Sequence, residues 1–351
     1  MNIGVRLPQY GGDWTTLCTV AQRLDRRGVH ALWVNDHLQS PGRIKNEPTF
    51  EGFTTLAAVS QLTSSARLGI AVTSASYRPH HLIAKLGTVL DVMSGGRMVL
   101  GLGTGSDRAE HAAYGIPFPE PRERTDTVRR ALRVVGDMAA HPDGAAGDGL
   151  HHAPNRPAAL GPGGVPVWLA AHGPVLLRLA AREADGVIAA WVPPQDVAAR
   201  LAVAAGTAAD RAPLRAALYL RSGWWAPRRK LRAWLTAEAA ALNTTTDVVR
   251  PVAGTARRHR EGRLPGAGRL DEYAAVGVTD VILALPSRVP VEAYDALAER
   301  LLRTGPGIAG DIRRTGHLRP PQPGAAAGAA APRGTERRTP PRWRARSWRA
   351  R

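Results

Sequence analysis

Short runs of Val, Ile and Leu alternate with longer amphipathic stretches along most of the chain. Apolar runs of about four to eight residues between turn residues are typical of buried strands, whereas apolar spacings of three and four indicate helices. The short runs predict strands at residues 3–7, 31–34, 67–73, 98–102, 165–170, 186–190, 214–220 and 279–285. The longer stretches predict helices at residues 15–27, 53–63, 81–93, 122–139, 175–183, 196–205, 230–242 and 291–302.

This strict alternation predicts an α/β fold with a parallel sheet covered on both faces. Eight strand–helix units favour closure into a (β/α)8 TIM barrel over an open sheet. We assign residues 1–305 to the barrel and leave 243–270, which are polar, Arg-rich and without periodicity, as irregular or inserted. Chemistry in such barrels lies at the carboxyl ends of the strands, so the residues that follow each strand are the candidates.

The net charge of +18 is concentrated near the end of the chain. Eleven arginines and one glutamate between residues 313 and 351 give +10 and leave +8 for residues 1–312. Residues 306–351 are rich in Arg, Pro and Ala and have little to bury, which predicts a disordered basic tail. Such a tail is either a solvated segment or an arm that holds phosphates nonspecifically. We expect the former, and therefore no nucleic-acid partner.

Several classes of protein are excluded by composition. The single cysteine, Cys18, rules out an intramolecular disulfide and a cysteine-clustered metal site. The pairs His80-His81 and His151-His152 lack the spacing that places zinc ligands on one helix face, so we predict no metal. The first residues lack signal-peptide features, and no apolar run reaches the ~18 residues of a membrane span. A cytoplasmic location without membrane association is expected.

Asp36 and His37 follow the second predicted strand directly. Histidine exchanges a proton near neutral pH, so His37 could serve as a proton donor or acceptor beside a redox centre. Alternatively, Asp36 caps a turn and His37 is merely exposed.

Two loops of small residues follow the fourth and fifth strands. In the glycine-rich turn at 101–105, missing side chains would let a ring or phosphate approach the backbone, unless the glycines only form a tight turn. The turn lacks the position and spacing of a dinucleotide fingerprint. Residues 171–175 lead into a helix with proline at its first position, where free N–H groups favour an anion, or form a simple strand-to-helix turn.

Several segments together resemble the luciferase-like monooxygenase superfamily. The resemblance is good from residue 2 to about 192 and patchy to about 302, and the most specific block is residues 90–105. It is carried by residues 51–63, 67–105, 110–124, 166–191 and 273–285.

The resemblance implies a barrel that binds reduced FMN or the deazaflavin F420 at its mouth. The segment WVNDH at residues 33–37 is more similar to the F420-using branch. We therefore expect an F420-dependent oxidoreductase that transfers a hydride to or from a small organic substrate, since hydride chemistry belongs to the cofactor. The alternatives are an FMNH2-dependent monooxygenase supplied by a separate flavin reductase, and a non-catalytic flavin-binding or interaction protein. Members of this superfamily are often homodimers.

The resemblance also implies roles for particular residues. His37 would be the proton donor or acceptor, and Asp36 would orient it or contact the ring. The end of the third strand would carry a bulge and a non-proline cis peptide behind the ring, while the two small-residue loops would hold the ribityl chain and phosphate. Ser106 stands where related sequences often have tryptophan or glutamate. The implied cofactor contacts are Ala71, Val72, Thr73, Gly103, Thr104, Gly105, Ser106, Ala171, His172, Gly173, Pro174 and Val175.

Overall fold

The computed structural model describes residues 1–40, 47–144, 153–190, 192–207, 212–221, 267–285 and 289–303. All of these residues belong to a unit spanning 1–310. The helix predicted at 230–242 and the tail predicted at 306–351 lie outside the described residues. Within the described part of the chain, no helix is both long and apolar enough to cross a membrane.

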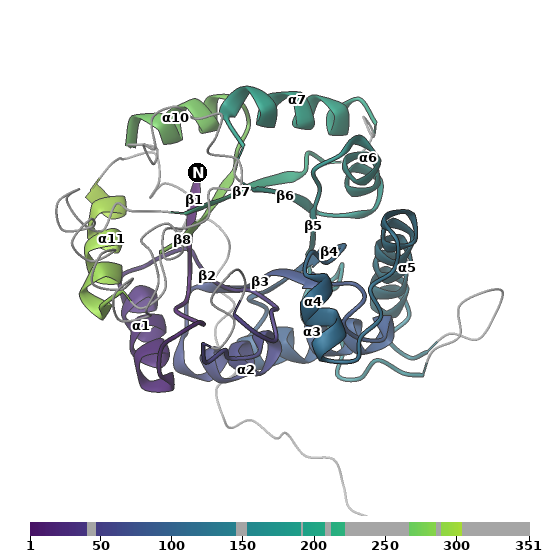
Figure 1. Ribbon diagram of the computed structural model, residues 1–351, viewed down its shortest axis with the longest axis horizontal. Coiled ribbons are helices and arrows are strands. Elements are labelled where there is room, and N and C mark those ends of the chain that lie inside the picture. Colours follow the sequence, from purple (N-terminus) through teal and green to yellow (C-terminus); the bar gives the residue numbers. More distant parts are fainter. Residues whose placement is uncertain are drawn as a thin grey trace, which may run out of the picture. The chain divides into compact units, whose positions relative to one another are not determined.

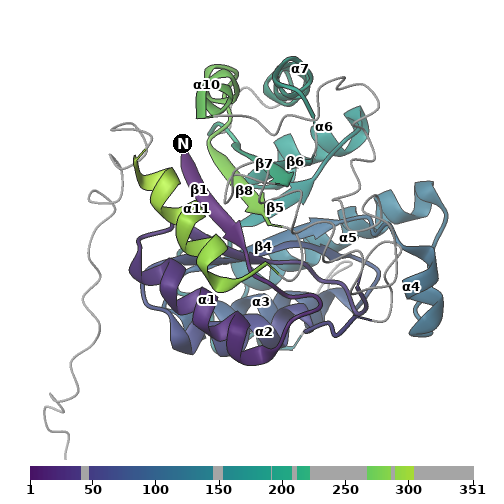
Figure 2. The same ribbon diagram turned by 60° about the vertical axis from the view of Figure 1, so that its left-hand side comes forward.

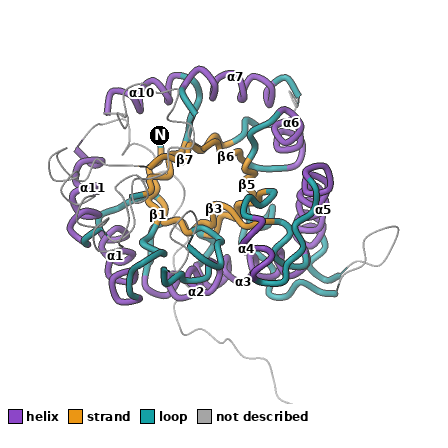
Figure 3. Tube along the Cα trace, viewed as in Figure 1, coloured by secondary structure: helices purple, strands orange, loops and turns teal. Residues whose placement is uncertain are grey.

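Eight parallel strands close into one barrel in sequence order, and the last strand pairs with the first. The predicted (β/α)8 architecture is therefore confirmed. The strands form the inner ring and the helices surround it (Figure 1; Figure 3). The strands are β1 (Asn2–Arg6), β2 (Ala31–Val34), β3 (Arg67–Ser74), β4 (Met98–Gly103), β5 (Val167–Ala170), β6 (Gly186–Ala190), β7 (Arg215–Arg221) and β8 (Asp280–Ala284).

The described helices follow the predicted order with two additions. The six-residue α4 was not predicted because it is too short to show a periodic apolar stripe. Helix α10 begins inside the segment 243–270 that the sequence left irregular, and Leu270 and Tyr273 are its buried anchors. The helices are α1 (Trp14–Arg26), α2 (Gly52–Leu62), α3 (His80–Ser94), α4 (Arg108–Ala113), α5 (Pro121–Ala140), α6 (Pro174–Glu183), α7 (Pro194–Ala205), α10 (Ala267–Ala275) and α11 (Val291–Arg303).

The first and last described helices, α1 and α11, pack side by side (Figure 2). Arg23 and Arg27 of α1 both bind the carboxylate of Asp295 on α11, at 2.7 and 2.9 Å. These ion pairs join the outer ring over the seam where β1 meets β8.

Two indole rings fill the interior of the barrel. Trp33 and Trp168 lie with their ring centroids 5.3 Å apart. Glycines on neighbouring strands make room for them: a Cβ at Gly69 would lie 2.2 Å from the Trp33 ring, and one at Gly186 would lie 2.7 Å from the Trp168 ring. Such distances are far below van der Waals contact, so these strand positions exclude any side chain.

We expect Gly69→Ala to destabilise the fold by about 1–3 kcal/mol, because the buried Trp33 ring must move to admit the methyl group. Urea unfolding measures the change. Gly136→Ala is the matched control, since Gly136 lies exposed in α5 with nothing within 4 Å of an added Cβ. A helical Gly→Ala change should stabilise the control by roughly 0.5–1 kcal/mol. Equal effects in the two variants would contradict this packing argument.

Candidate functional site

The residues predicted to form the site all lie at the carboxyl ends of their strands. Asp36 and His37 follow β2, and Ala71 to Thr73 lie in the last half of β3. Gly103 ends β4 and residues 104–106 follow it, while residues 171–175 run from the end of β5 into the first turn of α6. This is the face on which barrels of this type carry their chemistry.

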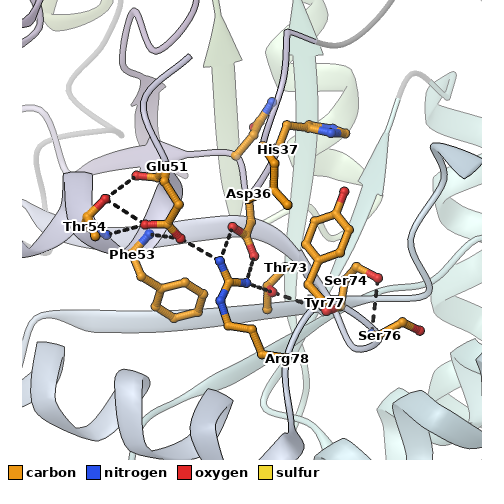
Figure 4. A network of polar contacts seen from close by, with 12 residues as sticks. Asp36, His37, Glu51, Phe53, Thr54, Thr73, Ser74, Ser76, Tyr77 and Arg78 are labelled. Carbon is orange, nitrogen blue, oxygen red and sulfur yellow. Dashed lines mark hydrogen bonds and ion pairs between the residues drawn. The ribbon is translucent and has the colours of Figure 1, made fainter. Parts of the chain in front are cut away.

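Asp36 is buried at this face and is bound by an arginine from the next loop. Its carboxylate accepts two hydrogen bonds from the Arg78 guanidinium, at 2.5 and 3.0 Å (Figure 4). Burial raises the pKa of the Asp36 carboxyl, and the ion pair with Arg78 opposes that rise. Asp36 therefore supports the rim through Arg78, and no backbone N–H of the described residues donates to its carboxylate; its contact with a cofactor ring stays a prediction.

Arg78 also joins the start of α2 to this ion pair. It binds Glu51 at 2.6 Å and lies with its guanidinium carbon 4.7 Å from the centroid of the Phe53 ring. Glu51 in turn accepts hydrogen bonds from the backbone N–H groups of Phe53 and Thr54 as the N-cap of α2. The loop after β2, the loop after β3 and the start of α2 are thus held by one guanidinium.

His37 is half-buried and is held by a carboxylate from α4. Its Nδ1 lies 2.8 Å from Oε2 of Glu110, whose side chain is fully buried. Glu110 also accepts hydrogen bonds from the backbone N–H groups of Leu38 and Gln39 and from the Tyr77 hydroxyl. Four donors from two loops therefore converge on this carboxylate.

These contacts determine which nitrogen of His37 is free. Burial alone would raise the pKa of Glu110, but the hydrogen bonds from His37 and Tyr77 outweigh it and lower the pKa to about 2. Burial and the contact with Glu110 raise the pKa of the Tyr77 phenol, which therefore remains a donor. Because the ionised carboxylate can only accept, Nδ1 of His37 carries the hydrogen. Nε2, for which the described residues offer no partner, is left to exchange a proton at the rim.

Strand β3 has the irregular backbone that the resemblance implied. Its register with β4 shifts between Ile70 and Thr73, and the Ala71–Val72 peptide is cis. Strand β4 lies close against this bulge: a Cβ at Gly103 would lie 2.6 Å from Val72. The glycines of β4 thus have a packing role next to β3, whether or not a ring also approaches them.

The loop after β5 leads into α6, whose amino end has no side-chain cap. Gly173 is the N-cap of α6, no side chain caps the helix, and a Cβ at Gly173 would meet nothing within 4 Å. Arg200 of α7 lies beside this turn, with Nη1 3.3 Å from Nδ1 of His172. Free N–H groups at a helix start beside a cation form a suitable setting for an anion.

The sequence did not predict the residues that hold Asp36 and His37 in place. Glu110 lay inside a segment used only for the resemblance, and Tyr77 and Arg78 were not considered. The rule that chemistry follows each strand would have pointed to Tyr77 and Arg78, which come just after β3. No sequence spacing links His37 to Glu110, which lies 73 residues further along.

The amino-acid sequence is similar to a known protein family and to several F420-dependent enzymes. The family model described as luciferase-like monooxygenase matches residues 2–284. The F420-dependent glucose-6-phosphate dehydrogenase of Kineococcus radiotolerans is 30% identical over 182 residues, 49% of this chain and 51% of the relative. The F420-dependent hydroxymycolic acid dehydrogenase of Mycobacterium tuberculosis is 32% identical over 221 residues, 60% of this chain and 59% of the relative. This chain thus spans about half the length of the curated relatives it matches.

Solved structures agree on the architecture. An F420-dependent secondary alcohol dehydrogenase, solved with an F420-acetone adduct, superposes with a TM-score of 0.66. The match covers 85% of this chain and 97% of that one at 17% identity, so it supports the fold alone. The family match extends over most of the sequence and includes every strand of the barrel. The chain therefore belongs to the luciferase-like monooxygenase family.

Proposed function

We propose that this protein is an F420-dependent oxidoreductase that moves a hydride between the cofactor and a small organic substrate. The observation that carries the proposal is the His37 ring, half-buried at the catalytic face with Nδ1 held by a buried carboxylate and Nε2 free. The F420-dependent relatives named above support the choice of cofactor.

The residues of the rim have different roles in this reaction. Bound F420 supplies the hydride acceptor or donor. His37 takes up or releases the accompanying proton at Nε2, and Glu110 holds the ring in the tautomer that makes this possible. The Asp36–Arg78 ion pair fixes the backbone from which His37 projects.

The anionic part of F420 has a suitable setting across the rim. The uncapped start of α6, the open position at Gly173 and the nearby Arg200 would hold a phosphate. The irregular β3 segment at Ala71 and Val72 and the turn at 103–106 would lie along the ring and ribityl chain, as the resemblance implies.

The test is direct binding of purified full-length protein to F420 and, separately, to FMN under reducing conditions. We expect a saturable F420 fluorescence change and no comparable affinity for reduced FMN. Preference for reduced FMN would replace the proposal with a monooxygenase that needs a flavin reductase. Binding to neither cofactor would favour a non-catalytic member of the family. The expected cytoplasmic location and homodimer stay predictions.

A further inference from the structure

Arg6, the last residue of β1, is a buried cation that has no anionic partner in the part of the chain that the structure describes. It is 6% exposed and forms no ion pair with a described carboxylate; its described hydrogen bond runs from Nη2 to the carbonyl oxygen of Leu285, at 2.9 Å. Its Nε is buried and has no hydrogen-bond partner. An arginine is always charged in proteins, and a buried unpaired charge carries a large free-energy cost.

Among the described residues, the groups around Arg6 include hydroxyl donors and no carboxylate that pairs with it. The titratable groups that act on it are three phenols, those of Tyr219, Tyr10 and Tyr294. The guanidinium carbon lies 5.2 Å from the centroid of the Tyr10 ring. The hydroxyl of Tyr294 is buried without a hydrogen-bond partner, and the hydroxyl of Tyr10 is buried beside the Asn35 side chain. The Nε of Arg6 and the hydroxyl of Tyr294 are thus buried donors without an acceptor, and an oxyanion would supply both the acceptor and the opposite charge.

The position of Arg6 connects this cluster to the candidate site. Side chains alternate along a strand, and Gly4, two residues earlier, faces Trp33 inside the barrel. Arg6 therefore lies on the inner face of β1, at its carboxyl end. The neighbouring Tyr219 donates a hydrogen bond to Asn35 at 3.3 Å, and Asn35 is followed directly by Asp36 and His37.

We propose that Arg6, Tyr10 and Tyr294 bind a carboxylate or phosphate group of the substrate. Assigning the anion to the substrate rests on the proposed function. It follows from position: the cluster lies at β1 and β8, whereas the setting suited to the cofactor phosphate lies across the ring beyond β5. An anion held here would place the rest of a small molecule beside the rim segment that carries His37. The favoured substrates are thus acidic alcohols or carbonyl compounds.

The experiment measures anion binding by the full chain without cofactor. Thermal midpoints are recorded against inorganic phosphate and malonate, with sodium chloride at equal ionic strength as the reference. A ligand that binds only the folded state raises the midpoint in a saturable manner, from which an apparent Kd follows. The variants are Arg6→Met and Tyr294→Phe, with Arg122→Met as the exposed arginine control and Arg200→Met to report on the start of α6.

We expect phosphate or malonate to raise the wild-type midpoint above the chloride reference. Arg6→Met should weaken the apparent Kd about 10-fold or more, and Tyr294→Phe about 3- to 10-fold. Arg122→Met should leave the shift in place, and Arg200→Met should remove only the part of the phosphate shift that arises at the start of α6. If Arg6→Met fails to fold, weaker binding by Tyr294→Phe with unchanged binding by Arg122→Met still supports the site.

Two results would overturn the proposal. One is that neither anion raises the wild-type midpoint above the chloride reference. The other is a shift that is lost in Arg200→Met but kept in Arg6→Met or Tyr294→Phe. The thermal midpoints are measured without F420. Failure of the protein to bind the cofactor would therefore remove the proposed function but would leave the anion site unaffected.

Discussion

Replacing His37 with alanine should lower the turnover number about 100- to 10,000-fold, the usual contribution of a positioned proton donor or acceptor. The affinity for F420 should change little, because the imidazole acts on the proton and the proposed contacts with the cofactor phosphate lie beyond β5. The measurement pairs steady-state kinetics, on a substrate that the wild type converts, with fluorescence titration of the cofactor. A selective fall in turnover identifies an interaction made in the transition state.

His141→Ala is the matched control for that variant. His141 is the C-cap of α5, and its side chain is 58% exposed and bonded to Asp137 of the same helix. Its loss should leave both turnover and cofactor affinity at wild-type values. Full activity of His37→Ala would remove His37 from the mechanism, whereas an equal loss of cofactor affinity would assign it to binding.

Arg78→Met should cost about 3–5 kcal/mol of folding free energy. The side chain of Asp36 is fully buried, and removing Arg78 leaves that carboxylate without its counter-ion in a low-dielectric setting. Glu51 and the Phe53 ring lose a contact at the same time. Urea unfolding of the two proteins at neutral pH measures the difference.

Two further variants test the cause of that loss. Arg108→Met removes an exposed arginine whose pair with Glu120 is long, at 3.4 Å, and should cost at most about 1 kcal/mol. The double variant Arg78→Met with Asp36→Leu removes both buried charges and should recover much of the stability. A double variant as unstable as Arg78→Met alone would show that the uncompensated Asp36 charge is not the cause.

The barrel could be predicted from sequence because its signal is local. Each apolar run and each amphipathic stretch is visible within about ten residues, and their strict alternation leaves few topologies. Helix α4 was missed because a six-residue helix completes fewer than two turns and shows no repeating stripe. Helix α10 was missed because it begins inside the polar, Arg-rich segment 243–270. The part of the helix beyond that segment is too short to show a repeating apolar stripe.

The candidate site could be predicted only in part, because its contacts are non-local. His37 and Asp36 were identified from their place after β2, but their partners Glu110 and Arg78 lie 73 and 42 residues away. The glycines after β4 left two interpretations open, room for a ring or phosphate and a tight turn, and the structure adds a packing reason at Val72 that no spacing could reveal. The sequence predicts which candidate residues lie at the end of a strand, but it does not predict which side chains from different loops contact one another.

Tyr77 and Arg78 are neighbours in the chain, yet each secures a different carboxylate of the rim, Glu110 and Asp36. A shift of this one loop would therefore disturb both sides of His37 together. Changes of length between β3 and α3 should be poorly tolerated during divergence of the family. New substrate preferences would then have to arise through the other loops of the mouth, with the β3–α3 connection kept at fixed length.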